Sequence, residues 1–294
     1  MAEFNETEPG IYTRGFGGDT SNCAIAAARQ GAEVAYLTSL GTDIFGDELV
    51  ALWAAEGVDT THVVRNVDAP TGLYFVTHDE AGHHFTYRRA GSAASQMQVH
   101  QLPLDALRSC RYLHLSAISQ AISADACDVC FEAMSIARAA GAQISYDTNL
   151  RLNLWPLPRA RAVVEASLHR ADIVLPSLED ATALSRLTDP QEVLDWILNA
   201  GPKLVALTMG VDGCWLATPH ARQHVAAHEV QAIDATGAGD VFDGALLARL
   251  AAGDSPAAAA QYASAAAALS TQAVGAVAPI PRADDVRQIL KSLG

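Results

Sequence analysis

Residues 234–245 read Asp-Ala-Thr-Gly-Ala-Gly-Asp-Val-Phe-Asp-Gly-Ala and lead into an apolar run with helical spacing. Gly237 and Gly239 stand where this loop becomes a helix, so the backbone can turn tightly and approach a ligand closely. A helix N-terminus offers free N–H groups and about half a positive charge, which attracts anions such as phosphate. Asp240 adds a carboxylate there, where a base could take a proton from a hydroxyl during phosphoryl transfer. The simpler interpretation of Asp240 is an acidic residue stabilised by the helix dipole.

The whole stretch is more specific than a lone Gly-x-Gly-Asp, and it fits neither a Walker A loop nor a Rossmann fingerprint. It resembles the second signature of the ribokinase/PfkB family of carbohydrate kinases, with Ala235 in place of the commoner threonine. The resemblance implies an α/β fold, a ribokinase-like three-layer sandwich with a mainly parallel central sheet and a small β-sheet lid. It also implies ATP and Mg²⁺ as cofactors, with a monovalent cation as a further candidate.

Composition narrows the class of partner. The chain has 294 residues, half of them hydrophobic, and a net charge of −14. This charge argues against a nucleic acid or an anionic membrane as partner, because both need a basic face. Five scattered cysteines, and no apolar run of membrane length, indicate a reducing cytoplasm. Cys127 and Cys130 fall in a helical pattern, so we interpret them as buried thiols on one helix face rather than as a metal or redox site.

A second glycine pair precedes the first predicted helix, which Asp19 or Thr20 could cap and Gly31 could end. A strand over 34–41 and a helix over 43–56 are expected next. This block resembles the other family signature, whose Gly-Gly-x-x-x-Asn piece carries the sugar site. The resemblance makes Gly17, Gly18, Asp19 and Asn22 candidate substrate ligands. The alternative for Asn22 is a local hydrogen bond at the helix start.

Residues 71–90 alternate around Asp79-Glu80-Ala81-Gly82 and predict a β-hairpin. In the family this hairpin forms a lid over the sugar, here from about 10–16 and 71–90, inserted in a single kinase domain of residues 1–294. Tyr87 and Arg89 are then substrate candidates. Since adjacent strand residues point to opposite faces, one of Arg88 and Arg89 is expected to face the ligand. Lids in the family often meet another subunit's lid, so a homo-oligomer is expected.

From about residue 102 strands and helices alternate, which predicts a parallel sheet covered by helices on both faces. Ligands bind at the carboxyl ends of such strands. By position there or by family resemblance, the candidate residues are Asn149 and Arg151 for substrate; Thr208, Gly210, Asp234, Thr236, Gly237, Gly239 and Gly275 for nucleotide; and Asp180 for metal. The metal assignment rests on Pro176-Ser177-x-x-Asp180, a loose match to the family's Pro-Asn-x-x-Glu.

Three segments, 14–20, 85–92 and 146–155, resemble 2-keto-3-deoxygluconate kinases. A sugar acid needs a charge-assisted partner for its carboxylate, and Arg89 and Arg151 could supply one. The alternative for Arg151 is a salt bridge with Asp147 or another acid. The implied reaction is ATP-dependent phosphorylation of 2-keto-3-deoxygluconate to its 6-phosphate. Asp240 is the base, and the N–H groups of Gly237, Ala238 and Gly239 stabilise the charge on the transferred group.

Two alternatives to this function remain: a kinase for another sugar or sugar acid, such as 2-keto-3-deoxygalactonate or fructose, and a catalytically inactive sugar-acid-binding protein. The chain departs from the family pattern in residues 1–16, which are polar with a short strand-like piece at the end. Family members begin with an apolar strand inside the sheet, and Met1–Asn5 stand where that strand should be ending. Either the start is misplaced or truncated, or something else fills the gap; if the chain is complete, we expect poor stability or altered assembly, because loss of an interior strand exposes backbone groups and core.

Overall fold

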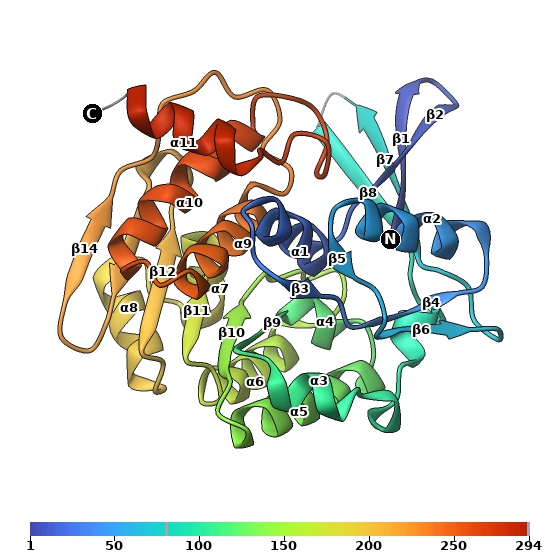
Figure 1. Ribbon diagram of the computed structural model, residues 1–294, viewed down its shortest axis with the longest axis horizontal. Coiled ribbons are helices and arrows are strands. Elements are labelled where there is room, and N and C mark those ends of the chain that lie inside the picture. Colours follow the sequence, from blue (N-terminus) through green and yellow to red (C-terminus); the bar gives the residue numbers. More distant parts are fainter. Residues whose placement is uncertain (80–81, 293–294) are drawn as a thin grey trace.

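A six-stranded sheet forms the middle layer of the computed structural model, which describes residues 1–79 and 82–292. Its strand order is β14-β13-β12-β11-β10-β9 (Figure 1). The four strands β9 to β12 are parallel, while β13 and β14 add antiparallel neighbours. The strand bounds are β9 Tyr112–Ser116, β10 Gln143–Asp147, β11 Ile173–Leu175, β12 Leu204–Thr208, β13 Cys214–Ala217 and β14 Arg222–Val225.

Helices cover both faces of this sheet because successive strand residues point to opposite sides. In β11, Ile173 and Leu175 join the core beneath α1, α9 and α10, whereas Val174 joins the core beneath α5 to α8. The predicted three-layer sandwich with a mainly parallel sheet is therefore confirmed. The helix bounds are α1 Asp19–Arg29, α2 Ile44–Ala55, α3 Leu104–Ser109, α4 Ala117–Ala121, α5 Ala124–Ala139, α6 Leu157–Leu168, α7 Leu178–Ser185, α8 Pro190–Asn199, α9 Ala238–Ala251, α10 Pro256–Ser270 and α11 Ala283–Ser292.

A separate four-stranded sheet has the order β2-β1-β7-β8 and projects from the sandwich (Figure 1). The predicted hairpin is formed by β7 (Leu73–Asp79) and β8 (Gly82–Arg88), and the predicted strand-like piece before residue 17 is β2 (Ile11–Phe16). The central turn residues 80 and 81 lie outside the described residues. The polar segment before β2 forms a further strand, β1 (Ala2–Glu8), which pairs with both β2 and β7. Backbone pairing on two sides holds this polar segment in a strand.

Two local expectations need correction. The single strand over 34–41 is two strands, β3 (Val34–Ala35) and β4 (Thr38–Gly41), which pair with β5 (Val58–Asp59) and β6 (Val63–Asn66). Neither Asp19 nor Thr20 caps α1: Gly18 is the residue before the helix, and these two side chains bond elsewhere, to Ser116 and Tyr36. Tertiary partners have replaced the local cap.

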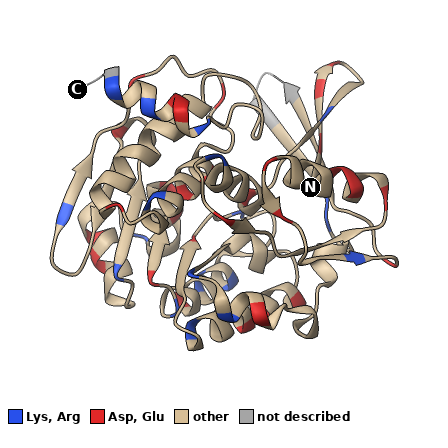
Figure 2. Ribbon diagram, viewed as in Figure 1, with Lys and Arg blue, Asp and Glu red and all other residues tan. Residues whose placement is uncertain are grey.

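Charged side chains are distributed over the whole molecule. Figure 2 shows Lys and Arg singly or in small groups among Asp and Glu, without a continuous basic stripe in the part of the chain that the structure describes. Within those same residues, no helix is both long and apolar enough to cross a membrane.

Candidate active site

Asp240 lies in the first turn of α9, directly after the predicted anion loop. Gly237, the residue before the helix, has a φ of 77°, a left-handed conformation that glycine adopts without strain. Among the described residues, no side chain caps this helix start. The N–H of Ala238 donates to the carbonyl of Ala235 at 3.1 Å, whereas the next N–H groups of α9, beside the Asp240 carboxylate, have no side-chain acceptor among the described residues and can meet an anion.

Asp234 holds the glycine loop and a second loop together. Its Oδ1 accepts hydrogen bonds from the N–H of Thr236 at 2.9 Å and from the Thr236 hydroxyl at 2.6 Å. Its Oδ2 accepts the N–H of Gly275 at 2.8 Å. Three of the predicted nucleotide residues thus form one cluster, in which the Asp234 carboxylate fixes two backbone segments.

Asn22 of α1 bonds directly to the predicted base. Its Nδ2 donates a 2.8 Å hydrogen bond to Asp240 Oδ2, across 218 residues of sequence. Asn22 is 3% exposed, and its Oδ1 is buried with no hydrogen-bond partner among the described residues. The Asn22 side chain was considered for a local hydrogen bond at the helix start. Its amide instead bonds Asp240, in the second signature.

Close packing of two helices makes this bond possible. A Cβ on Gly244 of α9 would lie 2.3 Å from the carbonyl oxygen of Cys23 and 2.8 Å from the Cβ of Ala26, both in α1. Only glycine lets the helices approach to this distance. The second signature therefore contains a glycine needed for helix packing, Gly244, one helical turn after Asp240.

Burial of its carboxyl group and the charges of neighbouring half-buried carboxylates raise the pKa of Asp240. Burial raises the pKa of Asp240 well above its usual range, the charge of Asp19 raises it further, and the bond from Asn22 lowers it. Asp147 adds to the increase and Arg151 opposes it. Burial also raises the pKa of Asp147, to about 7. A cation near this group favours the ionised form of Asp240, the form that a base requires.

The carboxyl end of β10 places Asp147, Asn149 and Arg151 in one loop. Asp147 Oδ1 accepts the N–H of Asn149 at 2.9 Å, and the exposed Arg151 donates to the carbonyl of Leu150 at 2.8 Å. Arg151 forms no ion pair with any described residue, so the alternative of a salt bridge to Asp147 is not observed. The guanidinium is therefore free to meet an anion.

Asp180 braces this loop from α7. Its Oδ2 accepts the N–H of Leu150 at 3.0 Å, and its own N–H donates to Ser177 Oγ at 3.1 Å. No group of three or more His, Cys, Asp or Glu side chains that could hold a metal ion occurs in the described part of the chain. The contacts of Asp180 are thus those of a loop anchor, and a metal role for it remains a prediction.

Thr208 and Gly210 lie at the end of β12. The N–H of Thr208 donates to the carbonyl of Pro176 at 2.9 Å, and Thr208 forms a parallel bridge with Ser177. Gly210 begins a short 3-10 helix, Gly210–Asp212. These two residues share the carboxyl edge of the sheet with Asp147 of β10, as the strand pattern predicted.

One face of the four-stranded sheet carries a polar row across all four strands. The register places Gly15, Glu3, Tyr74 and Tyr87 side by side on β2, β1, β7 and β8. The Tyr74 and Tyr87 rings lie 5.9 Å apart, and the Tyr74 hydroxyl donates to Glu3 Oε2. A Cβ on Gly17 would be 2.0 Å from the Tyr74 hydroxyl oxygen, so this row lies against the predicted sugar residue Gly17.

The two adjacent arginines at the end of β8 differ in exposure, as the alternation of strand residues predicted. Arg88 is exposed, whereas Arg89 is half-buried, with its Nε 3.1 Å from Met1 Sδ. Together with Gly18 and Asp19, Arg89 also lines a large cavity. It forms no ion pair with any described residue.

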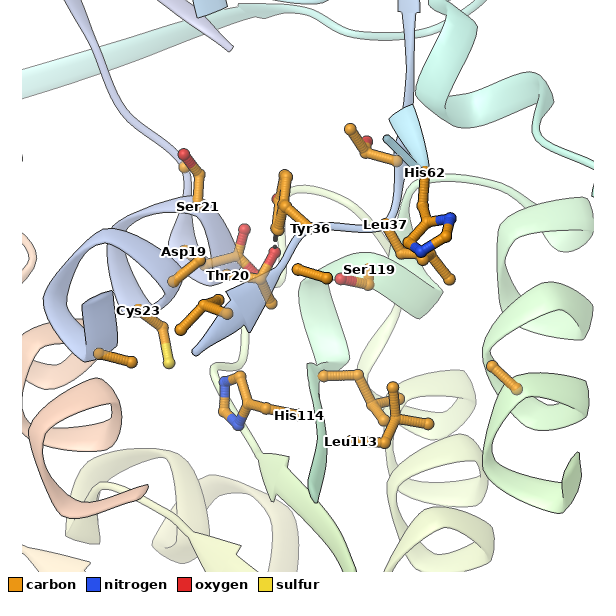
Figure 3. A pocket seen from close by; sticks show the side chains of 18 of the residues that line it. Asp19, Thr20, Ser21, Cys23, Tyr36, Leu37, His62, Leu113, His114 and Ser119 are labelled. Atoms are coloured by element: carbon orange, nitrogen blue, oxygen red, sulfur yellow. Dashed lines mark hydrogen bonds between the residues drawn. The ribbon is translucent and has the colours of Figure 1, made fainter. Parts of the chain in front are cut away.

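A cavity of about 1140 Å³ runs from this end of the site along β9. Figure 3 shows Asp19 and Thr20 beside Tyr36, with Thr20 Oγ1 2.9 Å from the Tyr36 hydroxyl, and His114 further along. Burial lowers the pKa of His114 to about 4, and its Nδ1 lies 3.1 Å from Ser145 Oγ. Between β9 and the 34–40 segment the wall is mostly apolar. Of the predicted sugar residues, Gly18, Asp19 and Arg89 line this cavity, and the others lie outside its lining.

Two residues of the site escaped the sequence analysis. Glu3 belongs to a segment that looked merely polar, and Tyr74 was part of a hairpin pattern without a role of its own. The signal for Tyr74 was present, because strict alternation in 71–77 and 84–88 pairs it with Tyr87. For Glu3 no local signal existed, since β1 is defined by its neighbours in space.

The geometry of the site agrees with what comparison with known proteins shows. The model of the pfkB family carbohydrate kinases matches residues 5–283. The chain belongs to the pfkB family of carbohydrate kinases. Fructokinase-1 of Oryza sativa subsp. japonica is 36% identical over 256 residues, which are 85% of this chain and 78% of that protein. The 2-dehydro-3-deoxygluconokinase of Bacillus subtilis is 30% identical over 290 residues, 97% of this chain and 89% of that protein.

Solved structures support the same conclusion for this pfkB kinase. A fructokinase with bound ATP from Xylella fastidiosa has a TM-score of 0.92 at 27% identity, covering all of this chain and 96% of that one. A fructokinase from Vibrio cholerae in a fructose-, ADP- and calcium-bound form has a TM-score of 0.89 at 28% identity, with 98% and 96% covered. The chain is a sugar kinase of this family, and these relatives include more than one sugar specificity.

Proposed function

We propose that this pfkB kinase transfers the terminal phosphoryl group of ATP to 2-keto-3-deoxygluconate, giving the 6-phosphate. The observation that carries the proposal is that Arg89 and Arg151 form no ion pair with any described residue, although half-buried carboxylates lie in the same site. Eight other Lys or Arg side chains pair with an acid among the described residues, whereas these two form no such ion pair. The carboxylate of a sugar acid would supply the missing partner.

In this mechanism Asp240 removes the proton of the attacking hydroxyl as the oxygen–phosphorus bond forms and ADP leaves. Asn22 orients the carboxylate through its 2.8 Å hydrogen bond. The N–H groups of Gly237, Ala238 and Gly239 stabilise charge on the transferred group. The uncapped start of α9 fits a phosphate, since its N–H groups have no side-chain acceptor among the described residues.

Mg²⁺ would neutralise charge on the phosphates to which it is bound. Asp180 is the protein residue proposed to approach it, and Thr208, Gly210 and Gly275 are proposed nucleotide contacts. A monovalent cation is a further candidate cofactor in the proposal. Most of the rate enhancement then comes from placement and electrostatics.

Gly17, Gly18, Asp19, Asn22, Tyr87 and Asn149 are the remaining proposed substrate contacts. The four-stranded sheet is proposed to act as a lid on a single kinase domain. Exposed Ile11, Tyr12 and Phe85, 55%, 40% and 45% accessible, support a second copy meeting the lid. Neither nucleic acid nor membrane enters the proposal, and the expected compartment is the cytoplasm.

Fructose is the second candidate substrate, favoured by the 36% identity to the rice fructokinase. A coupled assay of ADP release separates the two when 2-keto-3-deoxygluconate, 2-keto-3-deoxygalactonate, fructose and ribose are compared at equal concentration. We expect the highest kcat/KM with 2-keto-3-deoxygluconate. Preference for fructose would reject the sugar-acid assignment while leaving the kinase. Binding of sugar acid without any turnover would instead indicate a binding protein.

A further inference from the structure

The connection between α10 and α11, residues 271–282, lies against the glycine loop of the site. A Cβ on Gly237 would be 3.3 Å from the carbonyl oxygen of Ala276 in this connection. One residue earlier, the N–H of Gly275 donates to Asp234 Oδ2 at 2.8 Å. The path of the α10–α11 connection therefore decides where Gly275, a proposed nucleotide contact, is placed.

The end of α1 holds the far side of this connection through its carbonyl groups. Backbone carbonyls outside helices and strands need donors from elsewhere when they are buried. Nη1 of Arg29, in the last turn of α1, donates to the carbonyls of Val277 at 3.2 Å and Ile280 at 2.5 Å. Gln30, the next residue, donates through Nε2 to the carbonyl of Pro281 at 2.8 Å. Three carbonyls of the α10–α11 connection are thus bound by two adjacent side chains.

Glu56, the residue that follows α2, fixes the guanidinium of Arg29 from the other side. Nε and Nη2 of Arg29 donate to the two Glu56 oxygens at 2.8 and 2.6 Å, and the two side chains are 9% and 12% exposed. Only the planar fork of arginine can bind a carboxylate with two nitrogens and leave a third for the carbonyls. The hydrogen bonds from Arg29 hold the pKa of Glu56 below its usual value, so the pair is ionised at neutral pH.

Helix α1 thereby contacts both halves of the site. Asn22, near its start, bonds the proposed base Asp240, and Arg29, two turns later, bonds the α10–α11 connection. These seven residues of helix span about 10 Å. The close approach at Gly244 keeps α1 against α9. The position of the α10–α11 connection is therefore set relative to the base by one short, tightly packed helix.

We propose that Arg29, held by Glu56, is a positioning residue for the nucleotide, because it fixes the α10–α11 connection so that Gly275 meets ATP. Arg29 acts through the backbone carbonyls that it holds and takes no part in the transfer itself. This inference rests on the proposed function for the nucleotide contact at Gly275. It gives a role to a buried ion pair that the mechanism above does not use.

The test compares Arg29→Lys with Arg161→Lys, a matched control. Lysine keeps the positive charge, but its single nitrogen cannot bind the Glu56 carboxylate and two carbonyls as the guanidinium does. Arg161 also donates to two backbone carbonyls, those of Ala183 and Leu184, at 2.7 and 2.8 Å. Its carbonyls belong to α7, which packs on the other face of the sheet.

Binding of MgATP is measured by calorimetry without sugar, and kcat and both KM values are measured with whichever sugar the wild type phosphorylates best. We expect Arg29→Lys to weaken MgATP binding about tenfold and to raise KM for ATP as much, with KM for the sugar changed less than about twofold and Arg161→Lys unchanged. Unchanged affinity for MgATP would overturn the proposal. An equal loss of affinity for ATP and sugar would overturn it too, because that result indicates a general disturbance of α1.

A milder variant decides the question if Arg29→Lys does not fold. Gln30→Met removes the donor to the Pro281 carbonyl while leaving the Arg29–Glu56 pair in place. MgATP binding weakened about threefold, at an unchanged KM for the sugar, supports the proposal, and unchanged MgATP binding overturns it. A wild type that binds MgATP but phosphorylates no sugar contradicts the proposed function alone, since the calorimetric comparison still tests Arg29. A wild type that binds no MgATP contradicts both.

Discussion

Asn22 and Asp240 are joined by a 2.8 Å hydrogen bond between the amide of α1 and the carboxylate of α9. The bond connects the two glycine-bearing segments of the sequence, one proposed to hold the sugar and the other the phosphates. It also lowers the pKa of Asp240, against the effects of burial and of Asp19. The amide therefore sets both the direction and the ionisation of the proposed base.

Removing this bond should move the pH dependence of the reaction. With Asn22→Ala, the pKa of Asp240 rises, so the acid limb of kcat/KM should move upward by about one pH unit. The rate at neutral pH should fall about tenfold, since a smaller fraction of Asp240 is ionised. The profile of kcat/KM against pH is the measurement. A limb that stays in place while the rate falls would assign Asn22 to sugar binding alone.

Asp147→Asn should move the acid limb of the kcat/KM profile to lower pH. The substitution removes a negative charge that raises the pKa of Asp240, so ionisation should occur at lower pH. A profile that moves upward, or only scales in height, would contradict the electrostatic account. The stability of the same variant can also be predicted.

Asp147 has a folded pKa of about 7, above its usual value of 3.8. Its contribution to stability is therefore fully present below about pH 4 and is lost as the pH rises through about 7. Asp147→Asn should be stabilised relative to the wild type by about 4 kcal/mol at pH 8, and by much less near pH 4. Urea unfolding at both pH values measures the difference. Equal free energies of unfolding at pH 8 would contradict the raised pKa.

Gly244→Ala should destabilise the fold by about 2 kcal/mol, because the new Cβ collides with the Cys23 carbonyl and pushes α1 from α9. The Asn22–Asp240 bond should lengthen, so activity falls as well. Gly239→Ala is the control for stability, since a Cβ there meets nothing within 4 Å. Urea unfolding of both variants is the measurement. Equal stability of the two variants would show that the helices can separate without cost.

Arg151→Ala should raise KM for 2-keto-3-deoxygluconate about 30-fold and change KM for fructose less than about twofold. The reason is that only the sugar acid offers a carboxylate to the unpaired guanidinium. Exposed Arg88, replaced by alanine, serves as the control for charge. A parallel loss with both sugars would make Arg151 a structural residue of the β10 loop.

The sequence predicted most of what depends on local pattern. The glycine loop, the start of the following helix and the alternating strands and helices are encoded within a few residues, and each is found in the structure. Arg88 and Arg89 separate to opposite environments because alternation is also local.

What escaped prediction depends on contacts between distant segments. The partner of Asn22 lies 218 residues away, so a local hydrogen bond was a reasonable alternative. The bond from the N–H of Leu150 to the Asp180 carboxylate joins two loops and had no local signal, while the metal role of Asp180 stays a prediction. Glu3 acquired its place only through pairing of β1 with β2 and β7.

Asp240→Asn tests the central claim most directly, with ADP release and sugar binding measured on the same samples. Asparagine keeps the size of the side chain and can still bond Asn22, but it cannot take a proton. We predict that turnover with 2-keto-3-deoxygluconate falls at least about 1000-fold while the sugar's dissociation constant changes less than about threefold. Turnover within about tenfold of the wild type would contradict the assignment of Asp240 as the base.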